Sequence, residues 1–170
     1  MKKSYGVVVL LSIMLAASTV VAQDRPKFEP AAKMQLQSSP GLPECAKLAV
    51  ANGDPTKGAG VIYAKWPAGC TVPMHWHMAN EQLIMVSGSG KMAHQGGTAA
   101  ETLSKGAFVF MPAKHQHNFT CTTACEFYVV TDGAFDIHYV DRSGNEIPPE
   151  QAIGAKKLAA GTKSKKETKQ

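Results

Sequence analysis

Residues 69–88 read G-C-T-V-P-M-H-W-H-M-A-N-E-Q-L-I-M-V-S-G, and this stretch decides the fold. His75 and His77 are one residue apart. Their side chains share a face of an extended strand, because strand side chains alternate with a period of two. After a turn, Glu81 opens a second apolar strand, residues 82–86. The turn therefore brings two imidazoles and a carboxylate to one wall, which makes three parts of a metal site.

A fourth part is predicted from residues 106–119, which read G-A-F-V-F-M-P-A-K-H-Q-H-N-F. Pro112 ends one strand, the chain turns, and His117 begins the next. If these strands lie beside those of residues 69–88 in one small barrel, the His117 ring can point into the same cavity. Three imidazoles and one carboxylate, with room left for water or substrate, form an open site for a divalent transition metal.

Together the two segments resemble the signature motifs of the cupin superfamily. The first family motif, G-x5-H-x-H-x3-E-x6-G, is matched at every fixed position, by Gly69, His75, His77, Glu81 and Gly88. The second, G-x5-P-x-G-x2-H-x3-N, is matched by Gly106, Pro112 and His117. The resemblance implies one bound divalent transition metal, with zinc, copper, iron, manganese and nickel left open. The four ligands it implies are His75, His77, Glu81 and His117.

The chain departs from the second motif at two positions. Lys114 stands where cupins have glycine, and Cys121 stands where they have asparagine. Glycine adopts a positive φ without strain, so a lysine indicates that the turn does not need one or is shaped differently. Outside the motifs, residues 53–55 and 133–139 resemble a subgroup of small exported cupins.

Short apolar stretches, closely spaced and separated by glycine and proline, extend along the rest of the chain. This pattern, without a convincing amphipathic helix, predicts an all-β sandwich or barrel. With the resemblance, the expected fold is a single cupin-type barrel, a double-stranded β-helix or jelly roll with little helix. The expected strands are 33–37, 46–50, 61–66, 74–76, 82–86, 91–94, 107–111, 118–121, 125–131 and 136–140, followed by a short helical turn from Pro149.

The first residues predict a cleaved secretory signal. Two lysines precede a nearly apolar run over residues 6–17, and small residues at 20–22 suit cleavage after Ala22. A membrane anchor is the alternative, but the apolar run is short for a span. We therefore expect a periplasmic or secreted protein with no stable membrane anchor. The expected segments are a signal peptide 1–22, an N-terminal arm 23–32, a barrel 33–150 and a disordered lysine-rich tail 151–170.

The formal net charge of +5 over 170 residues comes from the two ends of the chain. Residues 23–154 carry 10 basic and 12 acidic side chains, so the expected folded part is close to neutral. A basic patch interleaved with aromatic residues is missing from the sequence, which argues against nucleic acid as a partner.

Four cysteines in an exported chain predict disulfides. Cys121 and Cys125 are separated by three residues, about the length of a hairpin loop, which would place them opposite each other. We therefore favour the pair Cys121–Cys125, which leaves Cys45–Cys70 as the second pair. A cysteine-rich metal site is the rival interpretation, and it is disfavoured because no C-x-x-C pair is present.

Three further histidines and two phenylalanines have roles that the pattern leaves more open. His115 is expected at the cavity mouth, either exposed or hydrogen-bonded to a ligand residue. His94 and His138 are expected to be exposed or structural. Phe108 and Phe110 share one strand face and are expected to line either the cavity or the core.

The leading functional hypothesis is a metal-dependent enzyme acting on a small organic molecule, of dioxygenase or isomerase type. Glu81 is either a ligand or a base that detaches from the metal. The second hypothesis is a non-catalytic exported protein that binds a metal or small ligand, and a purely structural cupin is disfavoured by the full ligand set. Outside the cytosol, affinity order favours zinc or copper at the site. A homodimer, with the arm before Met34 swapped onto a partner, is left open.

Overall fold

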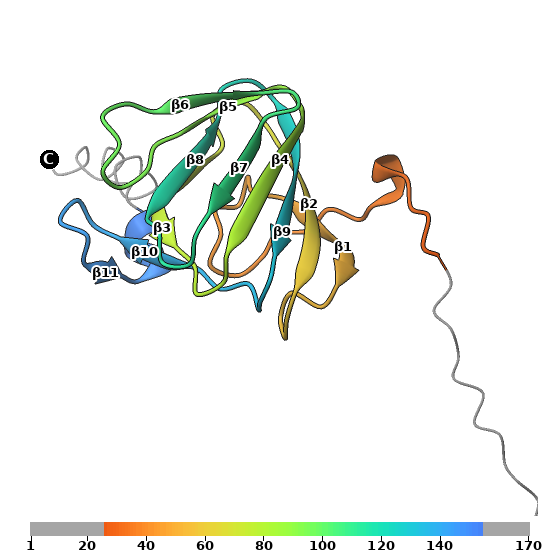
Figure 1. Ribbon diagram of the computed structural model, residues 1–170, viewed down its shortest axis with the longest axis horizontal. Helices are drawn as coiled ribbons and strands as arrows, with labels where there is room; N and C mark the ends of the chain where they lie inside the picture. Colours follow the sequence, from red (N-terminus) through yellow and green to blue (C-terminus); the bar gives the residue numbers. More distant parts are fainter. Residues whose placement is uncertain (1–25, 155–170) are drawn as a thin grey trace, which may run out of the picture.

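Two antiparallel sheets face each other in the computed structural model, which describes residues 26–154 (Figure 1). The first sheet has the order β1 (Leu48–Gly53), β2 (Gly60–Trp66), β9 (Cys125–Thr131), β4 (Glu81–Ser87) and β7 (Phe108–Met111). The second has the order β11 (Glu146–Ile147), β10 (His138–Val140), β3 (Thr71–Trp76), β8 (His117–Cys121), β5 (Ser89–Met92) and β6 (Glu101–Ser104). The all-β prediction with little helix is confirmed.

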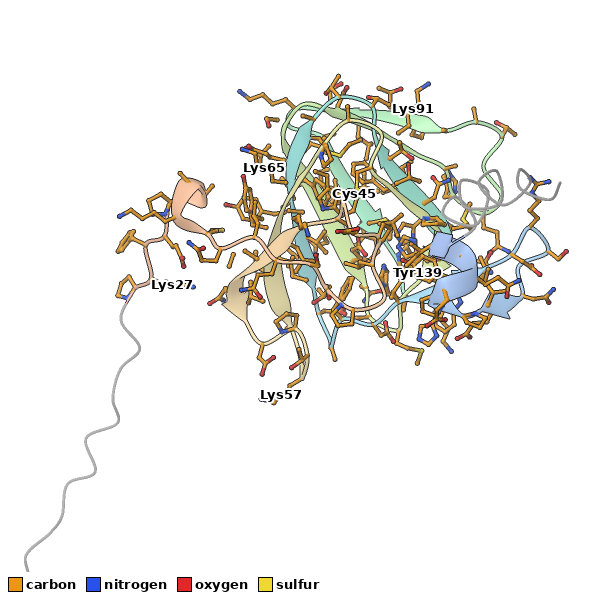
Figure 2. All side chains as sticks on the ribbon, turned by 180° about the vertical axis from the view of Figure 1, so that it is seen from behind. Lys27, Cys45, Lys57, Lys65, Lys91 and Tyr139 are labelled. Carbon is orange, nitrogen blue, oxygen red and sulfur yellow. A yellow bond between two sulfur atoms is a disulfide. The ribbon has the colours of Figure 1, made fainter. Side chains whose placement is uncertain are left out.

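The core lies between the two sheets and follows from strand alternation. In β9 every second residue is buried, so that Phe127 and Val129 point inward. Phe127 packs edge-on against Trp66 and Phe119, with ring centroids 4.8 and 5.1 Å apart. Edge-to-face contacts at these distances are the favoured geometry of aromatic pairs. The lysines labelled in Figure 2 lie at the periphery of the molecule, whereas the labelled Tyr139 lies among the central side chains and is 1% exposed.

Two disulfides connect elements of this core, as predicted. Cys45–Cys70 joins the segment before β1 to the start of β3, with the Cα atoms 5.7 Å apart. Cys121–Cys125 closes the turn between β8 and β9, with a Cα separation of 5.8 Å. Both separations lie in the range that a disulfide spans without moving the backbone.

The predicted strand at 33–37 is wrong. Ala31–Lys33 form a 3-10 helix instead, and only Gln37 makes a bridge, to Leu48. This part of the chain (orange in Figure 1) extends away from the sheets. Its alternating residues therefore have no neighbouring strand with which to form a hydrogen-bonded ladder.

The prediction that Phe108 and Phe110 line the cavity or the core is also wrong. Their side chains are 60% and 52% exposed. β7 is the edge strand of its sheet, and its inward positions are taken by Val109 and by the buried Met111. Strand parity correctly placed both phenylalanines on one face, but that face is the outer one.

The chain is helical over residues 149–154, in agreement with the predicted turn at Pro149. Ala152 and Ile153 pack against the core, so the ordered body extends beyond the expected end of the barrel at residue 150. The predicted signal peptide 1–22 and residues 155–170 of the predicted tail lie outside the described residues. Among residues 26–154, no helix is both long and apolar enough to cross a membrane.

Gly88, the last glycine of the first motif, is required by two separate constraints. It has φ +72°, and a Cβ built on it would lie 2.1 Å from the carbonyl oxygen of Ala124. Gly69, the first glycine of the same motif, has φ +81° but has no atom within 4 Å of a built Cβ. Substitutions at Gly69 and Gly88 therefore distinguish the energetic cost of a positive φ from the cost of a backbone clash.

We expect Gly88→Ala to lower the free energy of unfolding by about 3 kcal/mol, since strain at a positive φ is combined with a clash against backbone. The control Gly69→Ala should cost only about 1 kcal/mol, the usual penalty of a left-handed conformation. Urea unfolding followed by circular dichroism, with the disulfides intact, measures both values. Equal losses for the two variants would contradict this assignment.

Candidate metal centre

The four predicted ligands come from both sheets and meet between them. His75 lies on β3, His77 directly follows β3, and His117 is the first residue of β8. Glu81 is the first residue of β4, in the facing sheet. All four are buried. The structure thus brings together every residue of the set that the motifs predicted.

The strand register positions the imidazoles. His75 lies directly opposite His117 in the β3–β8 ladder and opposite Tyr139 in the β3–β10 ladder. The ring centroids of His75 and His117 are 4.3 Å apart, and those of His75 and His77 are 4.8 Å apart. One ring nitrogen from each of the three histidines lies within 4.8 Å of the others. Three buried imidazoles clustered in this way are consistent with a metal site.

Hydrogen bonds to backbone carbonyls orient all three rings. The Nδ1 of His75 donates to the Pro73 carbonyl at 2.7 Å, and the Nδ1 of His117 donates to the His115 carbonyl at 3.0 Å. The Nδ1 of His77 donates to the carbonyl of Asp136. A carbonyl oxygen can only accept, so each Nδ1 carries a proton. Each Nε2 is then the nitrogen that is free to bind a cation, which is the arrangement typical of metal-ligating histidines.

Glu81 supplies negative charge at the centre of this cluster. Its Oε2 lies 2.8 Å from Nε2 of His77 and 4.0 Å from Nε2 of His117. Despite the short distance, the buried Nε2 of His77 has no partner with hydrogen-bond geometry. The interaction between the two side chains is therefore electrostatic. An imidazole nitrogen and a carboxylate oxygen aimed at a common point fit a bound cation.

Burial and mutual contact set the protonation of the cluster. Burial, together with the neighbouring His117 and His77, lowers the pKa of His75 to about 3. Burial also lowers the pKa of His117. For His77, burial acts in the same direction, but the contact with Glu81 outweighs it and raises the pKa. Without a cation, His75 and His117 are therefore neutral, while the nearby charge of Glu81 favours a proton on Nε2 of His77. That proton has to leave before Nε2 of His77 can bind a metal.

The loop between His77 and Glu81 is held by a set of polar contacts. The backbone N–H of Asn80 donates to Asp132 at 2.9 Å, and the N–H of Met78 donates to the Asp136 carboxylate at 2.9 Å. Asn80 also accepts a hydrogen bond from the N–H of Ala113, at 2.9 Å. These contacts fix the spacing of two ligands that a free loop would leave variable.

Lys114 corrects one of the sequence-based interpretations. It has φ +64°, so the turn does use the positive φ for which cupins have glycine. Its N–H donates to the His77 carbonyl at 2.7 Å, and this contact holds the strained backbone in place. Lys114 therefore replaces the glycine of the motif but keeps a positive φ at this position of the turn.

The cluster lies at the wall of an internal cavity of about 50 Å³. Apolar side chains make up most of its lining, including Ile62, Leu83, Phe119, Phe135 and Ile137. The ionisable side chains in the lining are those of the cluster, His75, His77, Glu81 and His117.

The other three histidines lie apart from this cavity. The ring of His115 points to His94, with its Nε2 3.4 Å from the Nδ1 of His94, so its side chain does not support a ligand. The part of His115 that supports a predicted ligand is its backbone carbonyl, which accepts a hydrogen bond from His117. His138 stacks on Trp76, with ring centroids 3.9 Å apart, in agreement with a structural role.

Sequence reasoning missed Asp136, whose carbonyl orients His77 and whose carboxylate holds the loop at Met78. It also missed Asn80 and Asp132, which fix the same loop. The signal for Asp136 was its place in residues 133–139, the stretch that resembles small exported cupins. Nothing local marks a residue 59 positions away as the partner of His77.

Comparisons with known proteins agree with this geometry. The model of the ChrR cupin-like domain matches residues 31–136, more than half of the chain. This chain therefore belongs to the ChrR cupin-like family of the cupin superfamily. Comparison with curated protein sequences found no match.

Solved structures share the fold at low sequence identity. The polyketide cyclase RemF from Streptomyces resistomycificus matches with a TM-score of 0.59 and 14% identity, over 76% of this chain and 99% of its own. A proposed acetylacetone dioxygenase from Methylibium petroleiphilum matches with a TM-score of 0.56 and 17% identity, over 79% and 98%. An RmlC-like cupin from Shewanella frigidimarina matches with a TM-score of 0.53 and 14% identity, over 65% and 93%. The cupin fold predicted from the motifs is confirmed.

His138 links β10 to β11 beside the site, and its charge should make stability depend on pH. Its Nδ1 lies 2.8 Å from Glu146 and its Nε2 lies 3.1 Å from Asp136. Burial alone would lower the pKa of His138, but these two carboxylates outweigh burial and raise it. The stabilisation is therefore complete below the unfolded-state pKa and is lost as the pH rises through the folded-state pKa.

We expect His138→Gln to lower the free energy of unfolding by about 1 kcal/mol at pH 6 and by clearly less at pH 9. Glu146→Gln should show the same trend, because it removes a partner of the same pair. Urea unfolding at the two pH values, with a chelator present, measures the difference. A loss that is equal at pH 6 and pH 9 would show that the ion pairs contribute nothing.

Proposed function

We propose that this chain is an exported cupin that binds one divalent transition metal and acts on a small organic molecule by dioxygenase- or isomerase-type chemistry. The observation that carries the proposal is the cluster of three buried histidines, whose ring nitrogens lie within 4.8 Å of one another, with the Glu81 carboxylate beside it. His75, His77 and His117 would hold the metal, with Glu81 as the fourth ligand. When bound, the metal would polarise a ligand oxygen, lower the pKa of water or, if redox-active, activate dioxygen.

Glu81 is the residue of this chain best placed to move a proton. Its Oε2 lies 2.8 Å from Nε2 of His77, and its carboxylate lines the cavity that water or substrate would occupy. Burial raises the pKa of Glu81, but the contact with His77 outweighs burial and lowers it, so the carboxylate is ionised and able to accept a proton. Its two roles, ligand and base, are compatible if it detaches during reaction.

The cavity limits the substrate. A volume of about 50 Å³ admits only a few non-hydrogen atoms. Apart from the cluster itself, the described residues that line the cavity provide no charged group to orient a substrate. Recognition would then depend on a polar atom of the substrate at the metal and on the fit of a small apolar remainder against Leu83, Phe119 and Ile137.

The second candidate is a non-catalytic exported protein that holds a metal or a small ligand. The same small cavity favours it, because a metal enclosed by apolar side chains and four protein ligands has little room for chemistry. Both candidates require the same metal ligands, and they differ only in whether a bound organic molecule is changed.

We infer export from the predicted signal peptide 1–22, and the two disulfides support it, because disulfides persist in oxidising compartments. A chain that folds outside the cytosol acquires its metal there. Zinc and copper lead the affinity order of divalent ions for imidazole sites, so we propose that one of them occupies the site in the isolated protein.

Protein purified from its own exported compartment should contain about one tightly held metal per chain. His75→Ala/His117→Ala should lose it, because two imidazoles remove half of the ligand set. Elemental analysis after gel filtration measures the content, and His138→Gln serves as a control for histidine loss outside the cluster. A folded wild-type protein without metal would remove the basis of the proposal, and native iron or manganese would refute the choice of zinc or copper.

Catalysis should be detectable as a change in a small substrate that requires the metal. Metal-free protein and samples loaded with iron, copper or zinc are incubated with small phenolic, diketone or thiol compounds. Oxygen uptake and proton NMR of the substrates are recorded. We expect turnover in one loaded form and a loss of about 100-fold in Glu81→Gln, the usual effect of removing a general base. Binding without turnover in every loaded form would favour the non-catalytic candidate.

A further inference from the structure

A second pair of imidazoles meets outside the barrel cavity. His94 lies in the loop between β5 and β6, and His115 lies in the loop between β7 and β8. Both are half-buried. The Nε2 of His115 and the Nδ1 of His94 are 3.4 Å apart, and the two rings are tilted by 35°. Two loops distant in sequence therefore present one nitrogen each to a common point.

The separation of these nitrogens is long for a hydrogen bond, and it also fits a shared metal. Two nitrogens bound at about 2.0–2.1 Å to one ion, at a tetrahedral angle, lie about 3.3–3.4 Å apart. A hydrogen bond between two nitrogen atoms would be expected near the usual distance of about 3.0 Å. The spacing of 3.4 Å between His94 and His115 matches the first geometry.

The surroundings of the pair suit a cation that arrives from solvent. Both histidines line an open groove of about 380 Å³, and the Glu101 carboxylate lines the same groove. Among the described residues, the one cluster of three ligand groups within 4.8 Å is the internal one, so Glu101 acts here through its charge. The Nδ1 of His94 also lies 3.2 Å from the Gln95 carbonyl, which can only accept, so a cation binds at this nitrogen once its proton has moved to Nε2.

The groove site is distinct from the internal cluster. The side chain of His115 turns toward the groove, while its backbone carbonyl accepts the hydrogen bond from His117 on the cavity side. His94 pairs with His117 as an isolated β-bridge. A metal held by His94 and His115 would therefore tie the β5–β6 loop to the start of β8, the strand that carries His117.

We propose that His94 and His115 form a second, surface metal site, which takes a first-row divalent cation that prefers imidazole, with the remaining positions filled by water. Copper(II) should bind most tightly, followed by nickel(II) or zinc(II), in the general affinity order of these ions. The site is weaker than the internal cluster because it offers two protein ligands instead of four. It therefore fills only after metal is added.

The test is equilibrium dialysis of the full mature chain against copper(II) alone, with copper EPR to separate the two sites. Wild type should bind two ions per chain. His94→Gln and His115→Gln should each weaken the second ion by about 100-fold, because a two-point chelate becomes a single ligand. His138→Gln is the matched control, since it removes another half-buried histidine outside the groove, and it should keep both ions. A metal-free thermal melt checks that each variant folds.

The pattern of loss separates this proposal from the internal site. In His75→Ala/His117→Ala the groove ion should remain, even if the internal ion proves to be absent from wild type. Retention of both ions at unchanged affinity by His94→Gln or His115→Gln would overturn the groove site. Loss of the groove ion in His138→Gln would overturn it equally, and so would a wild-type protein that takes up no added ion.

Discussion

The internal site depends on three hydrogen bonds from imidazole Nδ1 groups to backbone carbonyls. They fix the tautomer of His75, His77 and His117, so that each ring turns its Nε2 toward the others. Two of the carbonyls belong to the residue two positions before the histidine, so these two hydrogen bonds are local in the chain. The third belongs to Asp136 and exists only because β10 lies beside β3. The register of the second sheet therefore decides whether three histidines become one site.

The facing sheet supplies the negative charge beside the three histidines. Glu81 enters from β4 and compensates the positive charge that burial would otherwise exclude from the interior. Desolvation acts against every charged group of the cluster, yet a proton stays on His77 because the Glu81 carboxylate is close. A cation that takes the place of this proton meets preformed ligands in a low-dielectric cavity, where electrostatic interactions are strong.

The small size of the cavity connects the two candidate functions. Aromatic contacts around Phe127 and Phe119 fill the space between the sheets and leave a small cavity beside the three histidines. Such a site can select a small substrate or simply retain an ion. The groove between the β5–β6 and β7–β8 loops is larger and open to solvent. His115 lies two residues before β8, and His94 forms a β-bridge with His117, the first residue of that strand. Metal chemistry in this chain would thus gather at one end of the second sheet.

The sequence alone was enough to predict the three clustered histidines, the cupin fold and both disulfides. Alternation along one strand places His75 and His77 on one face, and a three-residue loop brings Cys121 opposite Cys125, so these inferences needed only local geometry. The tertiary structure decided which face of β7 is solvated, and so exposed Phe108 and Phe110. It also decided the positive φ of Lys114 and the meeting of His94 with His115. Local pattern states which residues share a face, but the direction of that face and the partners across it depend on pairing between distant strands.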